Sequence, residues 1–438
     1  MMRSLYSGVS GLRSHQTKMD VIGNNIANVN TIAYKSSSVS FSEVFYQTTQ
    51  TASGSNAETG KGGQNAKQIG LGSTVGAIST AMDTEGASQR TDNPFDLKIT
   101  GSSSSFFIVR SSGNTYFTRA GDFTVDDSGA LVTQSGASVM GWSATDGVVN
   151  PDVVQPLYVK SPEYTYTDPE ESTALQVTGN INSSSANFQV DSAGNQKGET
   201  MTLSFYDNLG YRYQAQISIT QTDTDNYVGS IKAITKEGVA TDLTATFDGA
   251  ATFPITFAPG TGYQVDTAAP IEMQLVAGTN DNVDAFVTNS IMVDMTGIRC
   301  IGDATSFTYP SVPGNGKAVG KMSSVGISDV GEIIASYSNG DTLVIGQIAT
   351  QSFSNPAGLE KVGTNMYAAT LNSGEFDGVG EAINASGGKL AAGTIEMSNV
   401  DLSGEFTEMI TTQRGFQANS RIITVSDTLL EELINLKR

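Results

Sequence analysis

Both ends of this chain carry a heptad repeat of apolar residues, and this feature constrains the fold more than any other. Near the N-terminus the repeat includes Leu5, Leu12, Met19 and Ile26, with Ile22 at an intermediate position. Near the C-terminus it comprises Leu402, Met409, Phe416, Ile423 and Leu430, flanked by Phe406. A seven-residue apolar period is typical of helices that pack as coiled coils. Because the chain leaves along one helix and returns along the other, the two repeats favour an antiparallel pair.

The C-terminal helix is expected to be long. The repeat from about 402 to 436 would extend roughly 50 Å at ~1.5 Å per residue, and Asp401 precedes it as a candidate N-cap. A helix of this length needs packing partners. The alternative interpretation is an ordinary amphipathic helix packed on its own domain.

The middle of the chain indicates β-structure. Apolar residues alternate with polar ones over 201–205 and again over 213–219, and the turn sequence DNLG separates the two runs. This pattern predicts a hairpin with one buried face. Helical periodicity is nearly absent from 100 to 390. The predicted fold class is therefore mainly β with α-helical termini, in which nested β-domains are inserted between N- and C-terminal coiled-coil helices.

Clusters of proline and glycine mark the expected boundaries between domains. Prolines gather in 156–172 and in 309–321, and residues 50–75 form a Gly/Ser/Asn-rich segment with little to pack. We therefore expect four parts: a terminal helical domain (1–35 plus 400–438), a connector (36–75 plus 390–399), an inner β-domain (76–157 plus 321–389) and an outer inserted β-domain (158–320).

Composition excludes several functional classes. The net charge of −20 argues against nucleic-acid binding, because phosphate contacts need a basic surface. One His and one Cys cannot form a zinc site or a disulfide framework. No apolar run is long enough for a membrane span, and the N-terminus has no apolar core typical of a cleaved signal peptide. We expect no cofactor, no metal site and no enzymatic activity, although a carboxylate pair of hydrolase type stays open among 44 acidic residues.

Two isolated residues receive structural interpretations. His15 lies within the N-terminal repeat, so a surface or interface position is favoured over a catalytic base. Cys300 is expected to be a small buried residue, with a reactive or cross-linking thiol as the minority interpretation.

The terminal segments resemble the flagellar rod and hook proteins. The sequence MDVIGNNIANVNTIAYK (19–35) is similar to the family's N-terminal signature, and Ala33 stands where the family has glycine. The matching positions of that signature are Ala27, Asn28, Thr31, Tyr34 and Lys35. The segment 398–436 is similar to the family's C-terminal helix, with matches at Asn399, Asp401, Gln413, Arg414, Gln417 and Asn419 and with Phe416 at an aromatic position. Residues 114–123 and 355–374 resemble the family's inner β-domain, while GSSSSFF (101–107) departs from its Gly-x-Gly-Phe-Phe pattern.

The resemblance implies a structural subunit that self-assembles into a curved, flexible helical tube. Such a tube couples rod to filament, transmits motor torque and encloses the export channel. The implied partners are further copies of the chain, rod proteins, hook–filament junction proteins, the hook cap and the flagellar type III export apparatus. The implied location is the extracellular hook, reached without a cleaved signal peptide. The large insertion favours the hook branch of the family over the simple rod proteins.

The segment FSEVF is similar to an export signal of flagellar substrates, with Phe41, Val44 and Phe45 as its residues. A buried Phe41–Phe45 pair at helical spacing is an equally favoured interpretation. For the whole protein, a distal-rod subunit is the nearest alternative, and an extracellular β-rich hydrolase or adhesin is an alternative of another class.

Overall fold

The chain forms two compact units. The computed structural model describes residues 2–55, 60–190, 192, 194–223, 225–257, 270–276 and 290–436. The terminal unit comprises Met1–Ser161, Val325–Ala335 and Leu343–Arg438, and the inserted unit comprises Pro162–Ser324 and Ser336–Thr342. Part of the expected outer domain, 158–320, lies outside the described residues. No helix within the described ranges has the length and apolarity to cross a membrane.

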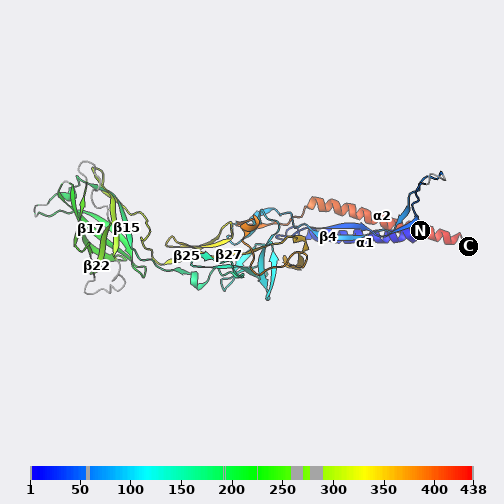
Figure 1. Ribbon diagram of the computed structural model, residues 1–438, viewed down its shortest axis with the longest axis horizontal. Helices are drawn as coiled ribbons and strands as arrows, with labels where there is room; N and C mark the ends of the chain where they lie inside the picture. Colours follow the sequence, from blue (N-terminus) through cyan, green and yellow to red (C-terminus); the bar gives the residue numbers. More distant parts are fainter. Residues whose placement is uncertain are drawn as a thin grey trace. The chain divides into compact units, whose positions relative to one another are not determined.

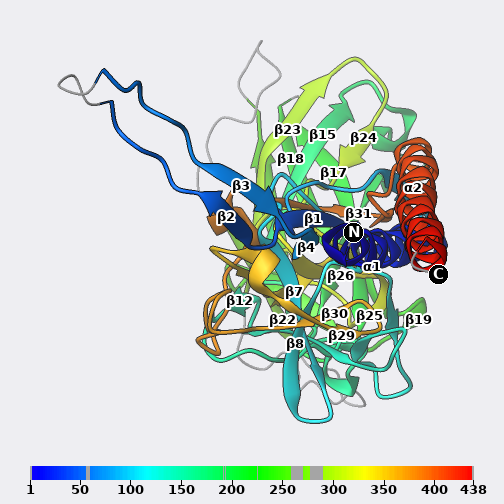
Figure 2. The same cartoon turned by 90° about the vertical axis from the view of Figure 1, so that its right-hand side faces the viewer.

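Two long helices form the ends of the terminal unit. Helix α1 spans Met2–Ala27 and helix α2 spans Leu402–Asn435, and they lie side by side in Figure 1 and Figure 2. The Lys18 ammonium contacts the Glu408 carboxylate at 3.0 Å, and Asn25 Nδ2 donates to Glu405 Oε1 at 2.9 Å. Rising numbers on α1 thus meet falling numbers on α2. The predicted antiparallel pair is confirmed, and so is the N-cap, since the Asp401 side chain accepts from the Ser403 N–H.

A two-stranded sheet covers the other side of α1. Strand β1 (Ser37–Glu43) pairs antiparallel with β4 (Ser73–Thr80), and both contact α1. Beyond them, β2 (Tyr46–Gln50) and β3 (Lys67–Gly70) form a separate ribbon that projects away from α1 in Figure 2. The glycine-rich segment expected to be a connector therefore contains part of a defined β-ribbon. Its Thr- and Gln-rich first strand suits that conformation because β-branched residues favour extended backbone.

The β-part of the terminal unit is built on one sheet with the strand order β27-β11-β7-β8-β30-β29. A buried aromatic cluster that includes Phe106, Phe117, Trp142 and Phe353 packs on it. Strands β25 (Gly320–Ile327) and β26 (Glu332–Tyr337) have residues in both units. The remaining strands are β5 (Ser88–Arg90), β6 (Leu97–Thr100), β7 (Ser105–Ser111), β8 (Asn114–Thr118), β9 (Phe123–Val125), β10 (Leu131–Thr133), β11 (Ser138–Thr145), β12 (Val148–Val149), β13 (Gln155–Pro156), β27 (Thr342–Ile348), β28 (Thr350–Ser352), β29 (Glu360–Gly363), β30 (Met366–Ala368), β31 (Lys389–Ala392) and β32 (Thr394–Glu396).

The inserted unit holds two five-stranded sheets around one apolar core. One sheet has the order β20-β22-β23-β15-β24, and the other has the order β16-β17-β18-β19 with β21 also on β18. The predicted hairpin is confirmed as β16 and β17, with Met201 opposite Ile217. The strands are β14 (Tyr166–Thr167), β15 (Ala174–Asn182), β16 (Glu199–Tyr206), β17 (Arg212–Asp223), β18 (Asn226–Lys236), β19 (Val239–Ala240), β20 (Thr244–Phe247), β21 (Thr252–Thr256), β22 (Ile271–Val276), β23 (Ile291–Ile301) and β24 (Ser306–Thr308).

The fold class agrees with the expectation from sequence. Between α1 and α2 the described residues hold strands and four short 3₁₀ turns, so the described chain is mainly β with helical termini. The terminal unit contains both the helices and the inner β-part. The finer division into four parts stays a prediction.

Helices α1 and α2 approach each other closely at Gly415. A Cβ added at Gly415 would lie 2.7 Å from His15 Cε1 on α1. The added methyl group should overpack the contact between the helices, so Gly415→Ala should lower the free energy of unfolding by about 1–3 kcal/mol. This loss is expected although alanine has a higher helix propensity than glycine. Gly23→Ala on α1 is the matched control, because a Cβ there meets nothing within 4 Å. That variant should be neutral or stabilising by up to about 1 kcal/mol.

Thermal unfolding followed by far-UV circular dichroism at 222 nm measures both variants. Equal melting curves for Gly415→Ala and Gly23→Ala would contradict the close approach of the two helices.

Candidate assembly site

The seam between α1 and α2 alternates apolar and polar layers. Most of the predicted heptad residues lie half-buried along it, and Ile22 is fully buried. These residues are Leu5, Leu12, Met19, Ile22, Ile26, Met409, Phe416, Ile423 and Leu430. The alternate α2 positions of the same seam are Glu405, Thr412, Asn419 and Ser426. Polar residues in a helical seam fix register at some cost in stability. The Asn25–Glu405 hydrogen bond is one such register contact.

Two of the residues predicted for the assembly interface are more exposed than the rest. Leu402 and Phe406 are exposed on the first turns of α2, and Ile410 continues the exposed side. About half of the Phe406 side chain and somewhat less of the Leu402 side chain is therefore accessible to other molecules.

A second heptad on α2 was missed by the sequence analysis. Ile422, Leu429 and Leu436 recur every seven residues with exposed fractions of 43%, 51% and 86%. Val425 and Leu433 lie between them and are also exposed. We call these five residues the outer stripe. Its period was visible in the sequence. Ile422 also borders the seam, because its Cγ2 would lie 3.7 Å from a Cβ added at Gly8 of α1.

Polar residues of the family motif border the outer stripe. Gln413, Arg414 and Gln417 are exposed on α2, and Arg414 lies 3.4 Å from Gln417 Oε1 through its Nη1. An open groove along this surface is lined by Arg414, Phe416, Gln417, Ala418, Ser420, Arg421, Ile422, Thr424, Val425 and Ser426. Asn419 faces α1 instead, where its side chain lies over Gly11.

The N-terminal motif forms the turn that leads from α1 into β1. Asn28 Nδ2 donates to the Asn24 carbonyl at the end of α1, just beyond Ala27. Thr31 Oγ1 donates to Asn28 Oδ1 at 3.0 Å, and Tyr34 Oη donates to Asn25 Oδ1 at 3.2 Å. These contacts satisfy polar groups at the helix end.

Ala33 adopts the backbone conformation for which glycine is usual. Its φ is +54°, a left-handed value that costs an L-residue roughly 1–2 kcal/mol. The Ala33 side chain is buried, and its N–H donates to the Glu396 carbonyl at 2.8 Å. The fold therefore keeps the local conformation although this chain has alanine at the position.

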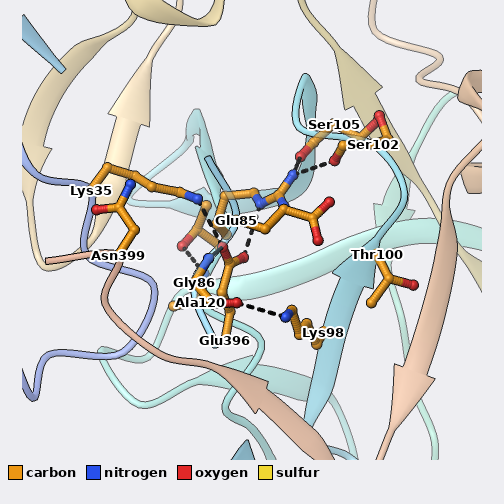
Figure 3. Close-up of polar contacts among 12 residues, drawn as sticks. Lys35, Glu85, Gly86, Lys98, Thr100, Ser102, Ser105, Ala120, Glu396 and Asn399 are labelled. Carbon is orange, nitrogen blue, oxygen red and sulfur yellow. Dashed lines mark hydrogen bonds and ion pairs between the residues drawn. The ribbon is translucent and has the colours of Figure 1, made fainter. Parts of the chain in front are cut away.

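A buried charge cluster joins both ends of the chain to the β-part of the terminal unit (Figure 3). At its centre the Glu396 carboxylate is fully buried, and it accepts from Lys35 Nζ at 2.8 Å and from Arg119 Nε at 3.2 Å. Lys35 follows α1, Arg119 follows β8, and Glu396 ends β32. Three segments distant in sequence thus meet at one carboxylate, and we call this group the charge cluster.

Backbone groups complete the charge cluster. The Gly86 N–H donates to Glu396 Oε1 at 2.9 Å, and Lys98 Nζ donates to the Gly86 carbonyl at 2.8 Å. Arg119 Nη1 donates to the carbonyl oxygens of Ser102 and Ser105 at 2.6 and 2.8 Å. The serine-rich segment that departs from the family pattern therefore supplies the acceptors for the buried guanidinium.

Electrostatics in the charge cluster favour the ionised carboxylate. Burial raises the pKa of Glu396, but the charges of Arg119 and Lys35 outweigh burial, so the pKa lies below its ordinary value. Burial lowers the pKa of Lys35, and its attraction to Glu396 offsets this only in part. Two buried cations, Lys35 and Arg119, contact this one buried carboxylate. Glu396 is therefore required to compensate them.

Asn399 holds the last residues before α2 against the start of β1. Its Oδ1 accepts from the Ser36 N–H at 2.7 Å, and its Nδ2 donates to the Ala81 carbonyl at 2.9 Å. Lys35 and Asn399 could be recognised from the sequence, whereas Glu396, Arg119 and Lys98 could not. Periodicity carries no signal for a buried ion pair, and the only hint was a charged residue between apolar neighbours.

The segment FSEVF lies in and after β1. Phe41 is in β1, and its ring contacts His15 edge-on at a centroid distance of 5.5 Å. Phe45 is 81% exposed. The alternative of a buried pair at helical spacing is wrong, because the segment is extended and both rings are exposed. The export-signal interpretation of Phe41, Val44 and Phe45 stays a prediction.

Within the part of the chain that the structure describes, no group of three or more His, Cys, Asp or Glu side chains could hold a metal ion. Cys300 is half-buried, with its Sγ 3.3 Å from Tyr227 Oη. His15 is half-buried at the helix seam, as the interface interpretation expected.

Comparison with known proteins points to one family. The model for the Flagella basal body rod protein matches residues 5–35, the Flagellar hook protein FlgE/F/G D1 domain matches 99–195, and the Flagellar basal body rod FlgEFG protein C-terminal matches 391–436. The first match covers α1 from Leu5 onward, the last match contains α2, and the middle match contains Arg119 of the charge cluster.

Full-length relatives include hook proteins and a rod protein. The chain is 36% identical to the flagellar hook protein FlgE of Treponema pallidum and 35% identical to that of Borreliella burgdorferi, with 100% of each chain covered. It is 31% identical to the flagellar basal-body rod protein FlgG of Bacillus subtilis, again with 100% of both chains covered.

Removal of the buried carboxylate should destabilise the terminal unit. Glu396→Gln leaves Lys35 and Arg119 uncompensated, so the free energy of unfolding should fall by about 3–5 kcal/mol at neutral pH. Because the folded pKa of Glu396 is depressed, its stabilisation is present above the unfolded value near ~4.3 and is lost as pH falls through the folded pKa. Urea unfolding between pH 3 and 7 measures this dependence.

The same titration separates this effect from general acid sensitivity. Glu396→Gln should show a flatter acid limb than the parent protein, whereas the exposed variant Glu360→Gln should reproduce the parent curve. Parallel curves for Glu396→Gln and the parent would contradict the assigned role of the carboxylate.

Gly86 should be intolerant of any side chain. A Cβ there would overlap the backbone carbonyl of Met397, and relief requires movement of the segment that carries Glu396. Gly86→Ala should cost about 3 kcal/mol, whereas Gly326→Ala, at a glycine whose Cβ meets nothing within 4 Å, is the matched control. Thermal denaturation of both variants provides the measurement, and equal stability would refute the close approach at Gly86.

Proposed function

The chain belongs to the flagellar hook protein family and is a structural subunit of the flagellar hook, and we propose that its copies assemble into a curved, flexible helical tube. The tube would couple rod to filament, transmit motor torque and enclose the export channel. The family is a structural one and is not known for enzymatic activity.

The observation that carries this proposal is the outer stripe of α2. The seam already buries one apolar side of α2 within the chain, and the outer stripe leaves a second heptad exposed. A sustained heptad exposed to water is costly, and burial against another helix removes that cost. Copies of the same chain supply such helices in a polymer.

Repetition of one contact between identical subunits explains a tube. A head-to-tail contact whose rotation does not close produces an open helical filament. We propose that the terminal helices form the inner wall and that the β-parts extend outward in the order of the expected domains. The charge of the chain supports this order, because residues 1–35 and 401–438 are close to balanced while the acidic excess lies between them.

Torque transmission requires that load on the helices reaches the β-part of each subunit. We propose that the charge cluster carries this load. Lys35 is attached to α1 through the N-terminal motif, Glu396 precedes α2 closely, and Arg119 belongs to the β-part. Buried, charge-assisted hydrogen bonds are short and directional, so they resist relative displacement of the segments that they join.

A distal-rod subunit is the second candidate, and the similarity to the Bacillus subtilis rod protein favours keeping it. The higher identities to hook proteins favour the hook. The shape of the polymer distinguishes the two, since a hook subunit should give curved tubes and a rod subunit straight ones.

If the chain is a hook subunit, its partners and its export route can also be proposed. The tube would contact rod proteins at one end and junction proteins or the hook cap at the other. The type III export apparatus would deliver the subunit without a cleaved signal peptide, and the exposed Phe41–Phe45 segment would be accessible to it before assembly.

A charge in the outer stripe should block assembly. Leu429→Glu introduces a carboxylate at the centre of the stripe, so the critical concentration for polymerisation should rise at least about tenfold. Its monomer should keep the helical signal, because Leu429 lies outside the α1–α2 seam. Thr428→Glu is the matched control, since the exposed Thr428 side chain belongs to neither the seam nor the outer stripe.

Sedimentation and electron microscopy of purified protein measure the outcome. Curved tubes from the parent and from Thr428→Glu, with none from Leu429→Glu, are expected. Normal tubes from Leu429→Glu would overturn the proposed role of the outer stripe.

A further inference from the structure

The β29–β30 hairpin of the terminal unit ends in a strained turn. Its register pairs Gly363 with Met366, so Thr364 and Asn365 form a two-residue turn. Both residues have positive φ, +48° for Thr364 and +59° for Asn365. Turns of this kind favour Asn-Gly or Gly-Gly, and a β-branched residue at positive φ is an outlier. Such strain persists where the surrounding structure fixes the backbone, and it is typical of clamps and functional contacts.

Asn365 attaches the tip of the hairpin to the N-terminal motif. Its Nδ2 donates to the Ile32 carbonyl at 2.9 Å, directly before Ala33 with its own positive φ. The Asn365 carbonyl accepts from Thr118 Oγ1 at 2.8 Å. Thr118 ends β8, and Arg119 of the charge cluster follows it. One turn residue therefore contacts both the segment that leaves α1 and the strand that leads to Arg119.

Lys361 holds the same segment from β29. Its Nζ donates to the Lys35 carbonyl at 3.2 Å and to Ser37 Oγ at 3.4 Å. The ammonium also lies 5.0 Å from the centroid of the Tyr34 ring, within the range of a cation–π contact. Side chains from two positions of one hairpin thus bind backbone carbonyls of the N-terminal motif.

These contacts differ in chemistry from the charge cluster. In the charge cluster the Lys35 side chain donates to a buried carboxylate. The hairpin instead binds the backbone of the motif, through an amide and an ammonium group. The acceptors of its three hydrogen bonds to the motif and to Ser37 are carbonyl and hydroxyl oxygens. This attachment therefore does not depend on the ionisation of Glu396.

We propose that the β29–β30 hairpin is a clasp, in which Asn365 and Lys361 are positioning residues that hold the exit of α1 against the β-part of the terminal unit. The strained turn is retained because it presents the Asn365 amide to the Ile32 carbonyl. The clasp gives the N-terminal motif an attachment of its own, besides the charge cluster. It operates in the single subunit, so it goes beyond the proposed function and needs no polymer.

Glycine at each of the two turn positions tests the clasp in the full chain. Asn365→Gly removes the amide, and glycine adopts a positive φ without strain. Hydrogen exchange of the amides at 28–37, measured by mass spectrometry on the monomer at neutral pH, should become about fivefold faster because a hydrogen bond is lost. Thr364→Gly is the matched control. It relieves strain and keeps both donors, so exchange at 28–37 should stay within about twofold of the parent.

A second variant tests the other donor. Lys361→Met keeps an unbranched side chain but removes the ammonium, and it should also accelerate exchange at 28–37 about fivefold. Amides of β8 and β30 report on the sheet itself. Their exchange should stay within about twofold of the parent in both Asn365→Gly and Lys361→Met. This comparison separates positioning of the motif from general weakening of the sheet.

Two results would overturn the clasp. One is equal exchange at 28–37 in Asn365→Gly and Thr364→Gly. The other is acceleration in β8 and β30 as large as that at 28–37, because Asn365 and Lys361 would then only stabilise the sheet. Neither result bears on tube formation, which sedimentation and electron microscopy test separately, so failure of the clasp is distinguishable from failure of the proposed function.

Discussion

Glu396 is the residue on which the terminal unit depends. Two buried cations, Lys35 and Arg119, contact a single buried carboxylate, so its charge is what makes their burial tolerable. The arrangement also fixes geometry, because each cation comes from a different part of the chain. Hydrophobic packing could hold these segments together as strongly, but it would allow them to slide. Charge-assisted hydrogen bonds specify one relative position.

In the helix pair, polar residues set the register while some apolar residues stay exposed. Its seam alternates large apolar residues with Glu405, Thr412, Asn419 and Ser426, which gives register at the expense of apolar burial. The apolar residues that would strengthen the pair are placed on the outer stripe instead. The single subunit therefore leaves part of its hydrophobic surface exposed, and contact with neighbouring subunits can bury it. This distribution suits a protein whose final stability comes from the polymer.

Much of the architecture could be predicted from sequence, because heptads and alternating strands leave periodic signals. The antiparallel helices, the 201–219 hairpin and the mainly β middle are of this kind. The charge cluster could not be predicted, since burial of Arg119 and Glu396 depends on contacts across hundreds of residues. Position 33 was flagged by the family's glycine, and Ala33 keeps a positive φ although alanine normally avoids it. Four-residue spacing misled at Phe41 and Phe45, where pairing of β1 with β4 overrides helical periodicity.

The sequence separation of the cluster has a consequence for the evolution of the chain. Lys35 and Glu396 meet although 361 positions separate them. The entropy of closing such a loop grows only logarithmically, and doubling its length costs about 0.6 kcal/mol. Once the ends are joined this firmly, the segment between them can lengthen or shorten with little thermodynamic penalty. A lineage can therefore exchange the inserted unit for a larger or smaller one while the ends of the chain keep the same contacts.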